Sequence, residues 1–193
     1  MSVHPKKSIL NLHGYKPNFG KSNLKKVIHL SANENPLGCS KKISNYLNKN
    51  NFNRYPPQLS EELISSIAKK HNLDKNKIIL GNGSDELISI IAQSYLNLGD
   101  EAIYTQYGFL QFPQAIAVAG GRSVVAKDLK LTVSIDNILK RVTKNTRIIF
   151  LANPNNPTGT FIKKKELLNL RKKLRNDILL VIDDAYFEYI KEK

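Results

Sequence analysis

Cysteine, histidine and long apolar runs are all scarce in this sequence. Cys39 is the only cysteine, so an internal disulfide is impossible. The histidines, His4, His13, His29 and His71, are scattered without the spacing of metal ligands, and we expect no metal site. No apolar run approaches the length that spans a bilayer, and no secretory-type apolar segment follows the first residues. We therefore expect a cytoplasmic protein without membrane association.

Acidic residues are also few, since 16 Asp and Glu stand against 30 Lys and Arg, for a formal charge of +14. Clustered basic residues would supply phosphate contacts to a nucleic acid. Here they are spread along the chain, and the densest runs, 163–165 and 171–175, fall on a predicted helix. That helix carries an apolar stripe, formed by Leu167, Leu168, Leu170 and Leu174. We interpret its basic residues as a solvent-exposed face, so no nucleic-acid partner is expected, although a basic surface would favour anionic substrates.

Patterns typical of strands and helices alternate along most of the chain, whose 193 residues, 41% of them hydrophobic, suffice for a core. Residues 1–30 are polar and irregular and are predicted to form an arm. Strands are predicted at 77–80, 101–104, 123–126, 147–151 and 178–182. Helices are predicted at 40–49, 60–71, 84–96, 109–119, 135–141 and in the basic segment. Repeated units of this kind predict an α/β fold with three layers, α/β/α, around a mostly parallel sheet.

The first polar loop, residues 81–86 (GNGSDE), opens the helix predicted at 84–96. Its glycines let the backbone approach a ligand, and the free N–H groups at a helix start favour a phosphate. The Gly-Lys-Ser/Thr of a Walker loop is missing, and Glu86 stands at the third glycine of a dinucleotide fingerprint. A nicotinamide-binding domain nevertheless remains an alternative. In either case Ser84 is predicted to cap the helix.

Two further polar loops follow predicted strands. Residues 151–160 (LANPNNPTGT) end a strand with two prolines and a glycine, and their amides are expected to point outward, although such a stretch is also common in ordinary turns. In residues 183–186 (DDAY), the Asp183 carboxylate ends an apolar strand and needs a cation or a donor to offset its desolvation. Because parallel strands share a carboxyl edge, the three loops are expected to converge at a ligand site.

Taken in order, GNGSDE, NPNNPTG and DDAY resemble the class I/II aminotransferases of the pyridoxal-phosphate fold type I group. Within that group, SANENPLG at 31–38, RYP at 54–56 and QYG at 106–108 resemble the histidinol-phosphate aminotransferases. The resemblance covers essentially the whole chain, although residues 14–20 depart from the family's tyrosine-proline-glycine arm. It implies a fold type I large domain that is incomplete at its C-terminus. Residues 1–52 would form the arm and the start of the small domain, and 53–193 the N-terminal part of the cofactor-binding large domain.

The resemblance implies pyridoxal 5′-phosphate as cofactor and gives several residues a role around it. Ser84 and Asp85 would hold its phosphate at the start of a helix. Tyr107 would stack on the pyridine ring. Asn156 and Tyr186 would both bond its phenolic oxygen.

Other implied roles concern the ring nitrogen, the neighbouring subunit and the substrate. Asp183 would pair with the ring nitrogen and keep it protonated. Tyr55 would reach the phosphate bound by the neighbouring subunit, which implies a homodimer. Tyr15 and Asn33 would lie near the substrate. For Tyr107 and Tyr55, as for any tyrosine, an ordinary half-buried position remains the alternative.

The implied reaction is transfer of the amino group of histidinol phosphate, a small phosphorylated donor, to 2-oxoglutarate in histidine biosynthesis. In this family the lysine that binds the cofactor covalently lies well downstream of the DDAY strand, and the arginines that bind the substrate follow it. No residue up to Lys193 is therefore assigned as catalytic, and these 193 residues alone are expected to be inactive. The alternative within the group is an aromatic aminotransferase or a relative of threonine-phosphate decarboxylase.

Overall fold

The structure, a computed structural model, describes residues 5–10, 12, 30–47, 53, 55 and 60–191. Most of the predicted N-terminal arm, Tyr15 included, lies outside the described residues. The chain divides into two compact units: Met1–His13 with Gly81–Lys193, and Gly14–Leu80. Each unit is described by itself. The boundary predicted after residue 52 concerns functional domains and stays a prediction.

The unit Gly14–Leu80 is helical in its described part. It contains α2 (Lys41–Leu47), α3 (Glu61–His71) and the 3₁₀ turn η1 (Lys75–Lys77), so the helices predicted at 40–49 and 60–71 are confirmed. In α3 acidic residues occupy the first turn and basic residues the last, which suits the helix dipole.

The strand predicted at 77–80 is wrong. Lys77 ends η1, whose start is capped by the Asp74 carboxylate accepting from the N–H of Asn76 at 2.9 Å. Residues 78–80 have no assigned secondary structure and belong to none of the sheet's strands, and Ile79 is 77% exposed. An apolar segment becomes a strand only where a neighbour completes its ladder, and that neighbour cannot be identified from a local pattern. The loop at 81–86 therefore does not follow a strand of the described sheet.

A sheet of four strands forms the centre of the other unit. It consists of β1 (Glu101–Thr105), β2 (Arg122–Ala126), β3 (Thr146–Ala152) and β4 (Leu179–Asp183). The strand order is β2-β1-β3-β4, and all three pairings are parallel. The remaining four predicted strands, and the mostly parallel sheet, are thus confirmed.

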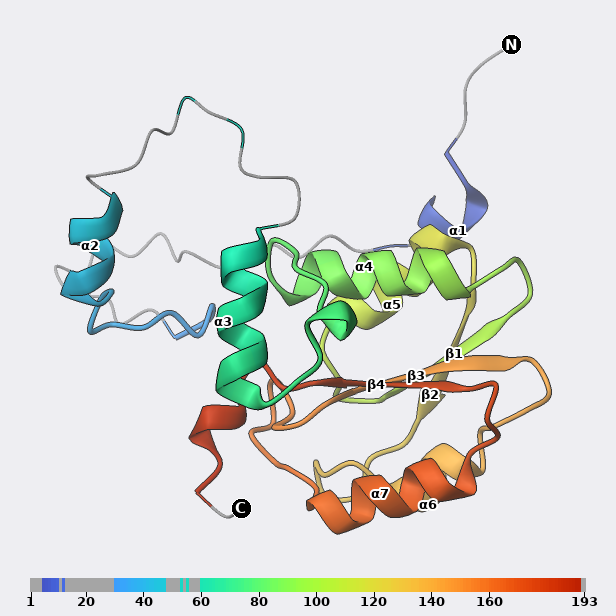
Figure 1. The fold of residues 1–193 in the computed structure, drawn as a ribbon. Helices are drawn as coiled ribbons and strands as arrows, with labels where there is room; N and C mark the ends of the chain where they lie inside the picture. Colours follow the sequence, from blue (N-terminus) through green and yellow to red (C-terminus); the bar gives the residue numbers. More distant parts are fainter. Residues whose placement is uncertain are drawn as a thin grey trace, which may run out of the picture. The chain divides into compact units, whose positions relative to one another are not determined.

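Helices cover both faces of this sheet. As Figure 1 shows, α4 (Ser84–Tyr95) and α5 (Gln111–Ala119) lie on one face, and α6 (Ile135–Leu139) and α7 (Lys164–Lys173) on the other. The short α1 (Lys7–Leu10) is near α5, where Nζ of Lys6 donates to the carbonyl of Val118 at 3.2 Å. The predicted three-layer arrangement is confirmed.

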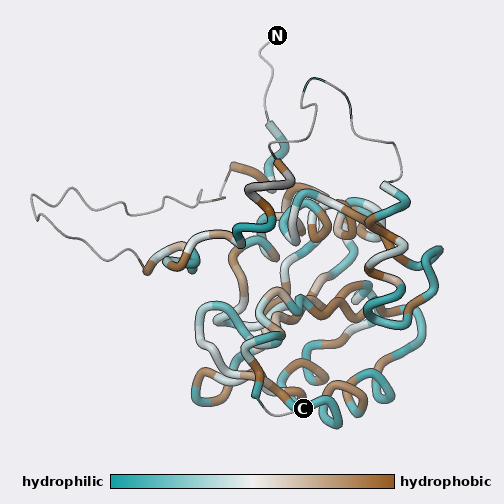
Figure 2. The backbone as a smooth tube through the Cα atoms, turned by 60° about the vertical axis from the view of Figure 1, so that its left-hand side comes forward, coloured by the Kyte–Doolittle hydropathy of each residue, from teal (hydrophilic) through white to brown (hydrophobic). Residues whose placement is uncertain are grey.

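The alternation of side chains along β3 builds two apolar layers, one on each face. Ile148, Phe150 and Ala152 join the cluster under α4 and α5, and Ile149 and Leu151 join the cluster under α6 and α7. Apolar side chains of β3 therefore contribute to both clusters, and Figure 2 shows hydrophobic segments running through the centre of the unit. A strand buried on both faces explains the uninterrupted apolar run in the sequence.

The basic helix α7 buries a narrower stripe than predicted. Leu170 and Leu174 are buried, whereas Leu168 is 53% exposed. Leu168 is offset by two residues, about 200° around a helix, from Leu170 and so faces away from the sheet. The lysines around it are solvent-exposed, as predicted.

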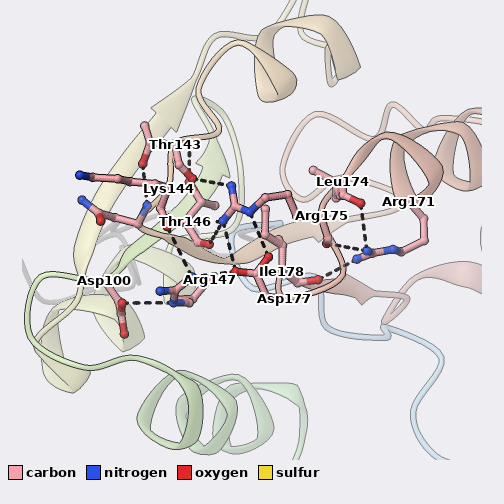
Figure 3. Close-up of polar contacts among 11 residues, drawn as sticks. Asp100, Thr143, Lys144, Thr146, Arg147, Arg171, Leu174, Arg175, Asp177 and Ile178 are labelled. Atoms are coloured by element: carbon pink, nitrogen blue, oxygen red, sulfur yellow. Dashed lines mark hydrogen bonds and ion pairs between the residues drawn. The ribbon is translucent and has the colours of Figure 1, made fainter.

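Arginine side chains tie together the amino edge of the sheet, where β3 and β4 begin (Figure 3). Arg175 donates to the carbonyl of Thr143 at 2.7 Å and pairs with Asp177 at 3.0 Å. Arg147 pairs with Asp177 at 2.9 Å and with Asp100 at 3.3 Å. These carboxylates are matched by cations at this edge, so their contacts account for the local structure without any ligand.

Candidate functional site

The strand order places a switch point between β1 and β3. From β1 the chain continues to β2 on one side and then returns to β3 on the other side of β1. In open parallel sheets, ligands bind at the carboxyl ends of the strands near such a point. The carboxyl edge of β1, β3 and β4 is therefore where a site is expected.

A small pocket of about 40 Å³ lies at this edge. The residues that line it are Ser84, Phe109, Ala152, Pro154, Asn156, Asp183, Ala185 and Tyr186. Each of the three polar loops contributes to the pocket, as the sequence predicted. The first loop contributes Ser84, the second Asn156, and the third Asp183 and Tyr186. Its size, room for a few water molecules, means that it accommodates one edge of a ligand.

The start of α4 forms one wall of the pocket. The N-cap is Gly83 and not the predicted Ser84, which is the first helical residue. Gly83 has φ +84° and ψ 176°, a conformation essentially restricted to glycine, and it has no side chain to cap the helix. Glu86 reaches past the helix start and accepts from Nδ2 of Asn82 at 3.1 Å. The first N–H groups of α4 therefore have no side-chain N-cap and suit an anion.

The loop after β3 is closed by its own asparagines. Nδ2 of Asn153 donates to the carbonyl of Ile162 at 3.1 Å, and its Oδ1 accepts from the Ile162 N–H at 2.8 Å. Asn155 is 2% exposed and donates to Oγ1 of Thr158 at 2.8 Å. The expectation that these amides all point outward is thus wrong, because two of them satisfy buried groups of the loop. Asn156 is the amide that lines the pocket.

Asp183 brings a partly buried carboxyl group to the pocket from the end of β4. Burial raises its pKa, the N–H of Ala185 at 3.1 Å opposes the rise, and the Asp85 carboxylate adds to it. Burial and the neighbouring carboxylates of Asp183 and Glu188 likewise raise the pKa of Asp184. Within the described residues no basic side chain forms an ion pair with Asp183. The carboxyl edge therefore carries unmatched negative charge that suits a cationic ligand group.

Tyr107, in the turn after β1, is 41% exposed and does not line the pocket itself. Its main chain is nevertheless fixed to the site loop, since its carbonyl accepts from Nδ2 of Asn155 at 2.9 Å. Sequence reasoning missed this contact although the motif contains Asn155. It also missed Asp128, whose Oδ2 accepts from the N–H of Tyr107 at 2.9 Å.

The structure does not test the predicted roles of Tyr15, Asn33 and Tyr55. Tyr55, fully exposed, and Asn33, with φ +53°, belong to the unit Gly14–Leu80. Tyr15 lies outside the described residues. The roles of these three residues stay predictions.

The described residues hold no group of three or more His, Cys, Asp or Glu arranged to bind a metal. The helices among them are also too short or too polar to cross a membrane.

The polar groups at the carboxyl edge together offer three kinds of contact. They can bind an anion at the start of α4, accept a hydrogen bond from a protonated nitrogen at Asp183, and form hydrogen bonds to an oxygen through Asn156 and Tyr186.

Comparison with known proteins identifies the family and the fold of the chain. Residues 25–192 match the family model of aminotransferase class I and II. The chain is 45% identical, over 98% of its length, to the histidinol-phosphate aminotransferase of Pelagibacter ubique (strain HTCC1062). It is 43% identical, over 97% of its length, to that of Rhodopseudomonas palustris (strain HaA2). The chain spans about half the length of these curated relatives, 53% in each case.

Solved structures share the fold. A histidinol-phosphate aminotransferase from Sinorhizobium meliloti, in complex with pyridoxal-5′-phosphate, superposes with a TM-score of 0.78 over 81% of this chain and 44% of that one, at 24% identity. A putative histidinol-phosphate aminotransferase from Erwinia carotovora atroseptica superposes with a TM-score of 0.75 over 83% of this chain and 48% of that one, at 25% identity. The family match leaves the nicotinamide-binding alternative without support.

Proposed function

Because the chain belongs to the aminotransferase class I and II family, we propose that it provides the cofactor-binding half of a pyridoxal-phosphate-dependent transaminase whose amino donor is histidinol phosphate. 2-Oxoglutarate is the proposed acceptor. The proposed substrate is supported by relatives of that name, which match nearly the whole chain at 43–45% identity.

One observation carries the cofactor part of the proposal. A single pocket is lined by the start of α4 and by Asn156, Asp183 and Tyr186, so groups that suit a phosphate, a phenolic oxygen and a protonated ring nitrogen lie together. These are the three polar ends of pyridoxal 5′-phosphate. The residue types around the pocket therefore match the polar groups of the cofactor, one edge of which the pocket accommodates.

The phosphate would be held by N–H groups at the start of α4 and by the hydroxyl of Ser84. For Asp85 the proposal is limited to its main chain. Its carboxylate interacts with that of Asp183, and a second negative charge there would repel a phosphate.

Asp183 would hold the proton on the ring nitrogen. When bound, the cofactor supplies an electron sink for the bond cleaved at the substrate Cα. The Asp183 carboxylate stabilises the positive ring nitrogen on which this property depends, and the cation in turn offsets the desolvation of the carboxylate. Asn156 and Tyr186 would orient the ring through its phenolic oxygen.

The proposal extends to a homodimer, which the family resemblance implies, and to the cytoplasm, which the apolar pattern of the sequence predicts. Tyr55 would reach the cofactor phosphate of the neighbouring subunit, which suits its full exposure in the described structure. Tyr15 and Asn33 would lie near the substrate. Residues 1–52 would contribute the arm and the start of the small domain, and 53–193 part of the large domain.

The cofactor site is tested with 4′-deoxypyridoxine 5′-phosphate, which has no aldehyde and so cannot react with surface lysines. Calorimetric titration of the chain should show saturable binding at one site. Pyridoxine, which lacks the phosphate, should bind more weakly because it cannot use the start of α4. Absence of saturable binding, or equal affinity for the two compounds, would contradict the proposed cradle.

The substrate is tested with a chimera in which these 193 residues replace the matching half of the Pelagibacter ubique relative. We expect it to transfer the amino group of histidinol phosphate to 2-oxoglutarate, with the same preference over phenylalanine as the intact relative shows. A preference for phenylalanine would favour an aromatic aminotransferase, a fold neighbour of which, from Pyrococcus horikoshii, superposes with a TM-score of 0.67 over 72% of this chain and 41% of that one.

A further inference from the structure

The main chain of Tyr107 is held from both sides by side chains that are distant in sequence. Its N–H donates to Oδ2 of Asp128, 21 residues later, at 2.9 Å. Its carbonyl accepts from Nδ2 of Asn155, 48 residues later, at 2.9 Å. Because these groups flank one Cα, the two bonds together restrain the direction of the Cα–Cβ bond. The loops after β1, β2 and β3 are thereby joined at a single residue.

The Asn155 side of the clamp and the turn that contains Tyr107 are themselves held by hydrogen bonds. The Asn155 N–H donates to the carbonyl of Thr160, its carbonyl accepts from the N–H of Gly159, both at 2.8 Å, and its side chain also holds Thr158. On the other side, Gly108 closes a tight turn onto the carbonyl of Thr105 at 2.9 Å. The backbone at Tyr107 is therefore fixed by its neighbours in space as well as in sequence.

The ring of Tyr107 contrasts with its backbone, because the residue is 41% exposed. An aromatic ring that is accessible on a fixed backbone presents a flat face at small entropic cost. The loop that fixes it is the loop that carries Asn156, the next residue after Asn155, into the pocket. A ring restrained from this loop keeps its position relative to any ligand bound by Asn156.

The arrangement costs stability in the ligand-free chain. Oδ1 of Asp128 and Oδ1 of Asn155 are both buried and have no hydrogen-bond partner within the described residues. Burial raises the pKa of Asp128, although the Tyr107 N–H opposes the rise. A partly buried carboxylate and a buried amide that each leave one buried oxygen unpaired are unfavourable for folding alone. A role in positioning accounts for their presence.

We propose that Asp128 and Asn155 are positioning residues, which clamp the main chain of Tyr107 so that its ring stacks on the aromatic ring of a ligand held at the carboxyl edge of the sheet. The inference rests on the proposed function, which places a pyridine ring there. It assigns to two residues outside the predicted site a role that they exert only through Tyr107.

A double-mutant cycle tests this dependence, with 4′-deoxypyridoxine 5′-phosphate as the probe. Asp128→Ala and Asn155→Ala should each weaken binding about three- to tenfold, the effect of one lost hydrogen bond. Tyr107→Ala should weaken it at least as much. In the Tyr107→Ala background neither substitution should weaken binding further, because the ring that they position is gone.

Matched controls separate positioning from general damage. Asp128→Asn keeps an oxygen that can accept from the Tyr107 N–H, so it should restore affinity to within about twofold of the unsubstituted chain. Arg147→Met removes polar contacts of similar number far from the clamp, the ion pairs with Asp100 and Asp177 at the amino edge of the sheet. It should leave affinity unchanged. Thermal melting by circular dichroism checks that each variant folds, and if Asn155→Ala does not, the two Asp128 variants decide the result.

The outcomes distinguish the inference from the function on which it rests. If the unsubstituted chain does not bind the probe, the proposed function fails and the clamp's role fails with it. If the chain binds but Asp128→Ala and Asn155→Ala still weaken binding in the Tyr107→Ala background, the cofactor site stands and the positioning role is overturned. Equal affinity of Asp128→Ala and the unsubstituted chain also overturns it.

Discussion

The carboxyl groups of Asp85 in α4 and Asp183 at the end of β4 interact, and the charge of the first helps to raise the pKa of the second. The two carboxylates have opposite consequences for function and for folding. They favour a cationic ligand group at the carboxyl edge, yet in the ligand-free chain they repel each other. At the amino edge, by contrast, Asp100 and Asp177 are matched by Arg147 and Arg175.

Asp183→Asn is expected to stabilise the ligand-free chain while impairing its binding site. The asparagine keeps an oxygen for the N–H of Ala185 but removes a desolvated charge. We expect the melting temperature to rise by about 2 °C, which corresponds to a gain of ~0.5–1 kcal/mol in the free energy of unfolding for a chain of this length. Affinity for 4′-deoxypyridoxine 5′-phosphate should fall at least tenfold. A variant that is less stable and binds normally would contradict the role of Asp183.

The same pair of proteins should differ in their pH dependence. Since the folded-state pKa of Asp183 is raised above its ordinary value of 3.8, the folded chain holds that proton more tightly than the unfolded chain. The carboxyl group therefore lowers stability as pH rises through 3.8 and the interval above it. Melting curves at pH 3 to 7 should show that the melting temperature of Asp183→Asn increasingly exceeds that of the unsubstituted chain as pH rises. At the acidic end the two melting temperatures should be equal. A gain that is constant with pH would exclude a charge effect.

Gly83→Ala should disrupt the start of α4 and the phosphate site together. At φ +84° an alanine is strained, with an expected cost of at least about 1 kcal/mol, although no atom lies within 4 Å of the added Cβ. Relieving that strain requires the helix start to move, which weakens binding of the phosphorylated probe. Gly99→Ala is the matched control, because Gly99 has φ +93° and equally open space but lies at the amino edge, before β1. Loss of affinity in both variants would point to general destabilisation.

Arg175→Ala should destabilise the fold without affecting the ligand site. The guanidinium donates to the carbonyls of Thr143 at 2.7 Å and Thr146 at 3.2 Å, and it pairs with Asp177. Losing the two bonds to the carbonyls is expected to lower the free energy of unfolding by roughly 1–2 kcal/mol, measured by urea denaturation.

Arg175→Lys should recover only part of that stability. The planar guanidinium donates to the two carbonyls and to the carboxylate at the same time, and a lysine ammonium cannot reproduce that geometry. Lys172→Ala, an exposed change on α7, is the control and should alter stability by less than about 0.5 kcal/mol. Affinity for the probe should stay unchanged in all three variants. A reduced affinity in Arg175→Ala at a temperature where it is folded would show that the two edges are coupled.

Local patterns in the sequence determined the repeated strand and helix units, the parallel sheet and the three polar loops. The uninterrupted apolar runs of β3 and β4 predict strands buried on both faces, and prolines and glycines mark where they end. These signals lie within a few residues of each other, so they can be identified from the sequence alone. The polar loops contain Ser84, Asn156, Asp183 and Tyr186, to which the family resemblance gave their predicted roles, and the fold brings these four residues to one pocket.

Tertiary structure alone decided what depends on distant partners. Residues 78–80 look like a strand but have no neighbour to pair with in the described sheet. Asn155 stands in a motif chosen for its outward amides, yet its Nδ2 holds the carbonyl of Tyr107, and Asp128 holds the N–H of the same residue. The same asparagine or aspartate can serve a ligand or a buried peptide group, because both need the same donor or acceptor. Which of them it serves depends on the group that packing places within 3 Å of it, and local sequence does not specify that neighbour.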